Sequence, residues 1–322
     1  MKKILIYCVI AFSFWSCKSE IHTGATPKRG FYSDRPAKIW EESLVSGNGI
    51  MGAMVIGDPY QESIVLNHAL LYLPIHSARK PVGQGKYLGK IQQMLLEDKY
   101  MEASRFVVDL ANSEGYKGKH ATDLFIPAFQ FNLLGDTSTV KQYERSVDFT
   151  SGEVIVNWED NNGVFTRKLF VSRPDNLVVL KFSSDEGASI NTTLSLSKII
   201  RHDVGRIKKF NLDDNFCIKK VESGTMDNGL YFKTWYERPW EFESRKSFKG
   251  YEGGKIEMDS DRLILRDATD VLIVARIEPS DNMEESRVLE MSNALKSYDG
   301  TYDELLAVHK KIHKELFERV SI

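Results

Sequence analysis

The chain has 322 residues, of which 43 are basic and 45 acidic, giving a formal net charge of -2. The two signs are intermixed and form no long basic run, which argues against a nucleic-acid partner. The three cysteines, at positions 8, 17 and 217, exclude a disulfide framework, because the first two belong to an N-terminal export segment.

That N-terminal segment predicts export and lipid anchoring. Lys2 and Lys3 precede an apolar stretch that ends at Trp15, which is too short to span a bilayer, so residues 1–16 are predicted to be a signal peptide. Ser16 places a small residue directly before Cys17, as a lipoprotein peptidase requires, and we expect Cys17 to be acylated. An ordinary secretory signal with an incidental thiol is the alternative. Residues 17–29 are polar and turn-rich and would form a tether from a membrane, so we expect an anchored lipoprotein, periplasmic or at the cell surface.

Residues 47–52 read Gly-Asn-Gly-Ile-Met-Gly and match the G-x-G-x-x-G pattern of nucleotide-binding turns. No acidic residue about twenty positions further on fits the ribose-binding role of that fold, and no kinase signature follows. We interpret the glycines as serving tight turns, with Asn48-Gly49 as the turn itself. The sequence therefore predicts no cofactor.

The next segments alternate between helical and strand patterns. Apolar residues over 87–95 and 100–110 follow helical spacing, which predicts two helices inserted into the chain. From residue 153 the pattern changes: Val154, Val156 and Trp158 share one face of a strand, and Asn162-Gly163 suits a hairpin turn before a return strand over 165–172.

Further strands are predicted over residues 177–182, 190–196, 255–258, 262–265 and 271–277, several of them apolar on both faces. Many short strands with turn signals predict a mostly β fold. We expect a large two-sheet antiparallel β-sandwich, or supersandwich, over residues 30–298, with helical insertions and a C-terminal linker helix over 299–322.

An aromatic cluster provides the candidate sugar contacts. Trp235, Tyr236 and Trp240 lie among charged residues in one stretch and could stack on sugar rings, although packing in a core or loop is the favoured interpretation of such a cluster. The adjacent Glu41 and Glu42 cannot both face inward from a regular element, so neither is assigned a catalytic role.

The C-terminal segment predicts a helix with an unpartnered face. Thr301 and Glu304 form a capping box, and Leu305, Val308, Ile312 and Leu316 form an apolar stripe that we expect to dock on something. His309 and His313 are spaced four apart but lack the glutamate of a zinc peptidase helix. We expect them on a solvated face, and we predict no metal site.

Several segments together carry a family resemblance. They are Pro36–Leu44, Gly47–Gly57, Leu66-Asn67, Ile91–Ala103, Arg167–Leu180 with Arg173-Pro174-Asp175, Gly253-Gly254 and Tyr302–Val320. In these segments the chain resembles the N-terminal sandwich region of family 95 glycoside hydrolases, which are mainly α-L-fucosidases. It departs from the family at residues 68–74 and 126–131, which leaves the substrate open.

In the resembling enzymes the sandwich leads through a linker helix into an (α/α)6 barrel that holds the catalytic groups. The resemblance therefore implies a non-catalytic domain, truncated or split, that acts on fucosylated glycans only with a separate barrel chain. No catalytic residue is carried over to this chain. The alternatives are a free-standing surface glycan-binding lipoprotein module without hydrolase activity and a structural lipoprotein with no sugar role.

Overall fold

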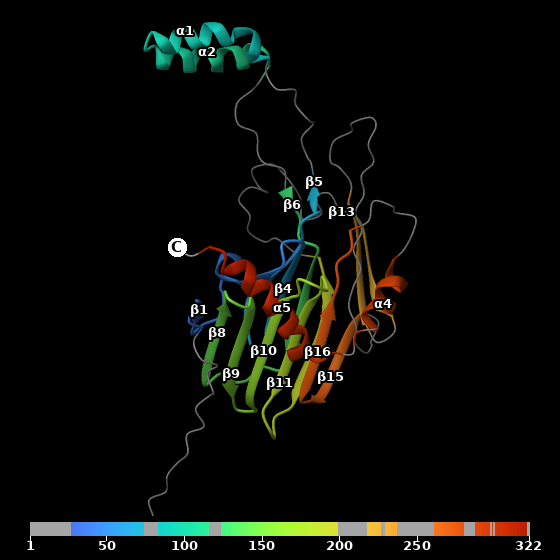
Figure 1. Cartoon of the computed structure of the whole chain (residues 1–322). Helices are drawn as coiled ribbons and strands as arrows, with labels where there is room; N and C mark the ends of the chain where they lie inside the picture. The colour runs from blue at the N-terminus through green and yellow to red at the C-terminus, as the bar shows by residue number, and fades with distance from the viewer. Residues whose placement is uncertain are drawn as a thin grey trace, which may run out of the picture.

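The computed structural model describes residues 27–73, 83–115, 124–198, 218–226, 229–236, 261–279, 287–296, 298 and 300–320. Two six-stranded antiparallel sheets face each other as a sandwich and form the body of the described structure (Figure 1). This confirms the predicted fold class. The signal peptide, Cys17, Cys217, Trp240 and the strand predicted over 255–258 lie outside the described residues.

The first sheet has the strand order β1-β8-β9-β10-β11-β16. It is a meander in its centre, because β8 to β11 follow one another both along the chain and across the sheet. Its strands are β1 (Gly30–Ser33), β8 (Gln142–Asp148), β9 (Glu153–Asp160), β10 (Gly163–Val171), β11 (Val178–Ser184) and β16 (Asp270–Ala275).

The second sheet has the order β15-β12-β7-β4-β3-β2. Its strands are β2 (Leu44–Gly47), β3 (Met51–Val55), β4 (Gln61–His68), β7 (Phe129–Gly135), β12 (Ile190–Ser197) and β15 (Arg262–Ala268). Two short pairs complete the strands, β5 (Tyr72–Leu73) with β6 (Leu124–Phe125) and β13 (Ile218–Met226) with β14 (Gly229–Tyr236).

The main core lies between the two sheets and is formed by apolar side chains at alternate positions of the strands. Val154, Val156 and Trp158 of β9 are all buried, as their spacing predicts, and Ile64 and Leu66 of β4 face them from the other sheet. Because successive strand residues point to opposite faces, the intervening positions are more exposed or lie on the outer faces. The register of the β9–β10 hairpin pairs Gly163 with Asp160, so the two turn residues are Asn161 and Asn162. The turn therefore lies one residue earlier than the predicted Asn162-Gly163.

The turn between β2 and β3 confirms the interpretation of the glycine motif. The Asn48 backbone N–H donates to the Met51 carbonyl at 3.1 Å, and Gly49 has a φ of 95°, a conformation that costs glycine little. The motif therefore closes a hairpin between antiparallel strands and does not lead from a strand into a helix.

The helices are 3-10 helices η1 (Trp40–Glu42) and η2 (Gln84–Tyr87), and α-helices α1 (Leu88–Leu96), α2 (Tyr100–Ser113), α4 (Val288–Lys296) and α5 (Tyr302–Phe317). The helices α1 and α2 confirm the inserted pair and contact each other. In the described part of the chain, none of the helices is long and apolar enough to cross a bilayer.

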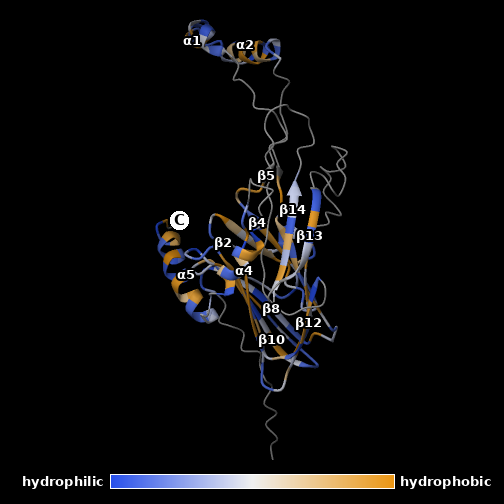
Figure 2. Ribbon diagram, turned by 90° about the vertical axis from the view of Figure 1, so that its right-hand side faces the viewer, coloured by the Kyte–Doolittle hydropathy of each residue, from blue (hydrophilic) through white to orange (hydrophobic). Residues whose placement is uncertain are grey.

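A second, smaller core lies on the outer face of the first sheet. Phe170 and Val179 of that sheet are fully buried beneath Leu295 of α4 and Tyr302 of α5. The Tyr302 ring meets the Phe170 ring edge-on, with centroids 5.2 Å apart. In Figure 2, α5 lies along one side of the sandwich with apolar and polar residues intermixed on its surface.

Candidate functional site

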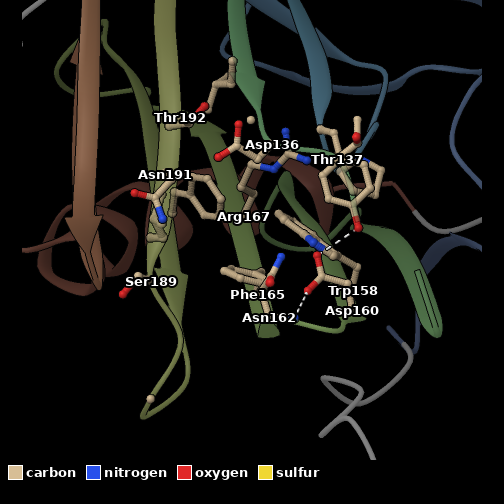
Figure 3. Close-up of a pocket in the computed structure, with 17 residues that line it drawn as sticks. Asp136, Thr137, Trp158, Asp160, Asn162, Phe165, Arg167, Ser189, Asn191 and Thr192 are labelled. Carbon is tan, nitrogen blue, oxygen red and sulfur yellow. Dashed lines mark hydrogen bonds between the residues drawn. The ribbon is translucent and has the colours of Figure 1, made fainter. Parts of the chain in front are cut away.

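A cavity of about 460 Å³ opens between the two sheets. Figure 3 shows it near the turns that connect β9 to β10 and β11 to β12. Its walls come from both sheets and from the loop after β7, so several segments far apart in the sequence contribute to it. Its volume falls in the range of about 300 to 1,000 Å³ that is typical of small-molecule sites.

Three aromatic side chains form one wall of the cavity. Trp158 stacks on Phe165 with ring centroids 5.3 Å apart, and Phe182 lies 5.6 Å from Trp158 and 6.3 Å from Phe165. Sheet register explains the cluster, because Phe165 pairs directly with Trp158 across β9 and β10 and Phe182 pairs with Arg167 across β10 and β11.

A buried ion pair lies behind this wall. The Arg167 guanidinium lies 4.7 Å above the Trp158 ring, and its Nη1 donates to Glu62 Oε2 at 2.9 Å. Its Nη2 donates to the carbonyl of Asp58, and the backbone N–H of Gly57 donates to Glu62. The side chains of Arg167 and Glu62 are only 3% and 1% exposed. Burial raises the pKa of Glu62 and lowers that of Arg167, while each partner shifts the other's pKa the opposite way.

Two buried N–H groups of the cavity wall lack a hydrogen-bond partner within the described residues. They are Nε1 of Trp158 and Nε of Arg167, which belong to side chains that are almost completely buried. An unsatisfied buried donor costs about 1 to 3 kcal/mol, and both of these atoms expose less than 1 Å² of surface, so they destabilise the domain slightly.

Oxygen-bearing side chains stand nearer the mouth of the cavity. Asp160 accepts from the Tyr60 hydroxyl at 2.9 Å and from the backbone N–H of Asn162 at 2.6 Å. Burial is the main reason that the pKa of Tyr60 rises to about 12, so its hydroxyl keeps its proton at neutral pH. Asp136 and Thr192 complete this polar side (Figure 3), whereas the side-chain oxygen of Asn191 accepts from the backbone N–H of Asp267.

Two carboxylates in or beside the cavity, Asp160 and Glu62, are already engaged by other groups of the domain. Hydrolysis of a glycosidic bond needs an acid and a second carboxylate or base on opposite sides of the bond. Here Glu62 is held by Arg167, and both oxygens of Asp160 already accept hydrogen bonds. Among the described residues, no three His, Cys, Asp or Glu side chains are grouped to hold a metal ion.

A second constellation lies where α5 meets the sandwich. The backbone N–H of Arg173 donates to Nδ1 of His309 at 3.1 Å, and its Nε donates to Nδ1 of His313 at 3.2 Å. Arg173 also donates to the Asn48 carbonyl at 3.0 Å. The Asn48 side chain donates in turn to the carbonyl of Ser172 at 2.8 Å. Residues from three segments of the family resemblance therefore meet where α5 packs on the sandwich, a place that we call the seat of α5.

The prediction that His309 and His313 lie on a solvated face is wrong. His309 is fully buried and His313 partly buried, and their Nε2 atoms lie 2.8 Å and 3.1 Å from the carbonyl oxygens of Ser151 and Phe149. Because Nδ1 of each ring accepts from Arg173, each Nε2 carries the proton and donates, so both rings are neutral. Burial lowers the pKa of His309 to about 4 and also lowers that of His313.

The structure places two of the predicted sugar contacts, Tyr236 and Trp235, in different surroundings. Tyr236 is 2% exposed and packs in the main core, and its hydroxyl lies 3.4 Å from the Pro127 carbonyl. Trp235 is partly exposed, with the ammonium groups of Lys220 and Lys233 within 4.8 Å of its ring centre. A sugar contact in this stretch stays a prediction, and within the described residues Trp235 is the better placed of the two.

The cavity residues were not selected from the sequence, although a signal for them exists. Glu62 is followed by the buried Ile64 and Leu66 at alternate positions, and Arg167 lies between the buried Phe165 and Leu169 in the same way. A charged residue on the apolar face of a strand must be paired or face a cavity. Sequence alone does not show that these two strand positions meet each other.

The described part of the chain is thus a two-sheet β-sandwich with a small polar and aromatic cavity and a docked C-terminal helix. Residues 31–284 match the family model described as "Glycosyl hydrolase family 65, N-terminal domain". This match spans most of the chain, so the protein belongs to that family of N-terminal domains. The predicted resemblance to a glycoside hydrolase N-terminal sandwich is thus confirmed.

Two individual proteins are also similar to the chain. Over 171 residues it is 22% identical to alpha-L-fucosidase 2 of Arabidopsis thaliana, a match that covers 52% of this chain and 20% of that enzyme. A solved structure described as a putative kojibiose phosphorylase from human microbiome aligns over 90% of this chain and 38% of its own, with a TM-score of 0.49 and 10% identity. The chain therefore spans a minor part of either protein.

Proposed function

We propose that this chain is the N-terminal non-catalytic domain of a family 95 α-L-fucosidase-like glycoside hydrolase. In this proposal it acts on fucosylated glycans only together with an (α/α)6 barrel that supplies the acid and base. The similarity to a plant alpha-L-fucosidase and the match to a glycoside hydrolase N-terminal domain support the proposal. Export and anchoring through Cys17 to a periplasmic or surface membrane belong to the same proposal.

The observation that carries the proposal is how α5 is held. Tyr302 and His309 fix one face of the helix to the sandwich through the second core and the Arg173 network. The adjacent side carries an apolar edge, which we define as Val308, Ile312 and Leu316, with exposed fractions of 55%, 37% and 39%. A rigidly placed helix with an exposed apolar edge suits the role of a linker helix between two domains.

The energy available at this edge is sufficient to matter. Fully burying one Leu, Ile or Val side chain is worth roughly 1.5 to 3 kcal/mol, so a barrel that covers the edge would gain several kcal/mol of association energy. Part of this surface is already covered in the isolated domain, since Ile312 and Leu316 are less than half exposed. The gain is therefore smaller than for three fully exposed residues.

The test is to capture the tagged chain from its own cells and assay the eluate with an aryl α-L-fucoside. We expect fucoside turnover in the eluate, and loss of that turnover when Ile312→Ser and Leu316→Ser are combined. The matched control, Lys311→Ser with Lys314→Ser, changes exposed positions of the same helix and should retain it. An eluate without fucosidase activity, or one whose activity survives the double substitution, would contradict a barrel partner on this edge.

A second candidate is a free-standing surface glycan-binding lipoprotein module without hydrolase activity. The observation that favours it is the cavity between the sheets, whose lining combines polar and aromatic side chains. The same capture experiment separates the two candidates, because this module would carry no fucosidase activity from cells.

A further inference from the structure

We propose that one corner of the sandwich rests on the surface of a lipid bilayer. The corner lies where the described chain begins, and we call Lys28, Arg29, Phe31, Tyr32 and Phe149 the anchor corner. The inference rests on the proposed acylation of Cys17, and it adds the face of the domain that meets the membrane.

The anchor corner presents aromatic and basic side chains to solvent. Phe31, Tyr32 and Phe149 are 50%, 59% and 46% exposed. Lys28 and Arg29 are exposed beside them. Aromatic rings are common at the headgroup level of membrane-bound proteins, and basic residues are attracted to anionic lipids. The composition of the corner therefore fits the boundary between water and hydrocarbon.

Backbone hydrogen bonds hold the corner together, although two separate segments supply it. The backbone N–H of Phe149 donates to the Arg29 carbonyl at 2.9 Å. Strand β1 pairs with the end of β8, with Tyr32 opposite Ser146. Because β1 is the outermost strand of its sheet, Phe31 and Tyr32 lie at the rim of the sandwich and not between its layers.

The position of the corner along the chain identifies lipid as its partner. Eleven residues separate Cys17 from Lys28. A chain of that length spans at most about 36 to 40 Å when fully extended. An acylated Cys17 therefore holds the corner within this distance of the bilayer and raises the effective concentration of lipid beside it. A contact that would be weak between free molecules is then sufficient.

The anchor corner leaves the apolar edge of α5 accessible. The Arg29 guanidinium lies 5.6 Å from the centre of the Phe317 ring, so the corner adjoins that side of the helix. Phe317 and Val308 are nine residues apart, which is about two and a half turns, so they point to opposite sides of α5. In Figure 1, β1 and the end of α5 lie on the same side of the sandwich. A bilayer at the corner and a barrel on the edge are thus compatible.

The experiment measures whether the corner lies in the bilayer. The full chain is purified from membranes of its own cells as Cys217→Ser variants with one introduced cysteine, labelled with a nitroxide and reconstituted into vesicles of phosphatidylethanolamine and phosphatidylglycerol. The label at Tyr32→Cys should favour oxygen over a water-soluble nickel chelate at least about threefold more than the label at Ile264→Cys, because interfacial apolar groups are buried roughly 5 to 10 Å. Ile264 is a matched control, since it is 45% exposed on β15 at the opposite rim from β1 (Figure 1).

A pair of double variants tests the aromatic contact itself. Phe31→Asp with Phe149→Asp should make the Tyr32 label as accessible to the chelate as the control label, while the protein stays in the vesicles. Leu134→Asp with Leu272→Asp makes the same change at residues that are 55% and 40% exposed elsewhere on the sandwich, and it should leave the Tyr32 label buried.

Two results on a chain with acylated Cys17 would overturn the inference. One is equal accessibility of the two labels. The other is a Tyr32 label shielded from both reagents, because protein and not lipid would then cover the corner. A chain without lipid on Cys17, as detected by mass spectrometry, would overturn the anchoring as well. None of these results depends on fucosidase activity, so the membrane contact and the barrel partner are tested separately.

Discussion

Individual residues explain why this sandwich holds charged and imidazole side chains in its interior. His309 is fully buried and neutral because Arg173 donates to one ring nitrogen while the Ser151 carbonyl accepts from the other. Protonation of Nδ1 would remove the first bond and place a cation beside the Arg173 side chain. The buried imidazole thus stabilises the seat of α5 only in its neutral form.

This predicts a loss of stability in mild acid. The pKa of His309 in the folded chain is about 4, whereas the ordinary value for a histidine is 6.5. The unfolded chain therefore binds more protons than the folded chain between these two pH values. Stability should be unaffected by this group above pH 6.5 and should fall as the pH decreases towards 4. From about pH 7.5 to about pH 5 the expected loss is about 2 kcal/mol, measured by urea unfolding.

His309→Gln should remove most of this pH dependence, since glutamine does not titrate, whereas Lys311→Gln on the exposed face should retain it. An unchanged slope in His309→Gln would show that the acid sensitivity arises elsewhere, for example at His313, whose pKa is also lowered.

The buried pair of Arg167 and Glu62 makes a second prediction at this scale. Arg167→Met leaves the Glu62 carboxylate buried without its ion-pair partner, and we expect about 3 to 5 kcal/mol of destabilisation in chemical unfolding. The double substitution Glu62→Leu with Arg167→Met removes both charges and should recover a large part of that loss. If the double variant is as unstable as the single one, the cost lies in packing and not in the unpaired charge.

At the level of secondary-structure elements, the sequence predicts where α5 begins but not which of its faces packs on the sandwich. The capping box of Thr301 and Glu304 is present in the structure, and the helix begins at Tyr302 directly after it. The apolar stripe, however, is not the face that the sandwich covers. Leu305 packs on the second core, whereas Val308, Ile312 and Leu316 remain partly exposed and His309 is buried in their place.

The strands show the same division. Alternation in β9 and β12 predicts these strands and their buried faces, because side-chain direction follows from local geometry, and the run that is apolar on both faces predicts β11. The partners of Glu62, Arg167 and His309 lie more than a hundred residues away along the chain. Such contacts depend on how the sheets pair, so the cavity and the helix seat could not be located from local patterns.

The two sides of α5 should respond differently to substitution. Tyr302→Ala removes a ring that is 3% exposed and packs on Phe170, and we expect a loss of about 3 kcal/mol or more. Ile312→Ser with Leu316→Ser should change the melting temperature little, because both residues retain substantial exposure. Should the double serine variant unfold the domain as Tyr302→Ala does, the apolar edge belongs to the sandwich core.

At the scale of the whole molecule, the N-terminal segment predicts a membrane attachment that lies outside the described residues. Cys17→Ala should release the protein into the soluble fraction or leave it unprocessed, because buried acyl chains contribute about 0.8 kcal/mol per CH2 to anchoring. Membrane fractionation with radiolabelled palmitate checks this prediction. Equal membrane partitioning of both forms, with label on neither, would contradict lipidation.

The chain spans 20% of the length of the plant fucosidase that it matches, and its described residues form a sandwich with docked helices. Asp160, which lines the cavity, and Glu62, which lies behind its wall, are both engaged in hydrogen bonds within the domain. These features agree with the proposal that this chain serves a barrel domain that performs the hydrolysis.

The most direct measurement is turnover of an aryl α-L-fucoside by the purified full chain alone. We expect no rate above background, because the proposal assigns to the barrel the acid and base that accelerate hydrolysis. A clear rate that disappears when one carboxylate of this chain, such as Asp136 or Asp160, is changed to its amide would contradict the account and place the chemistry in the sandwich.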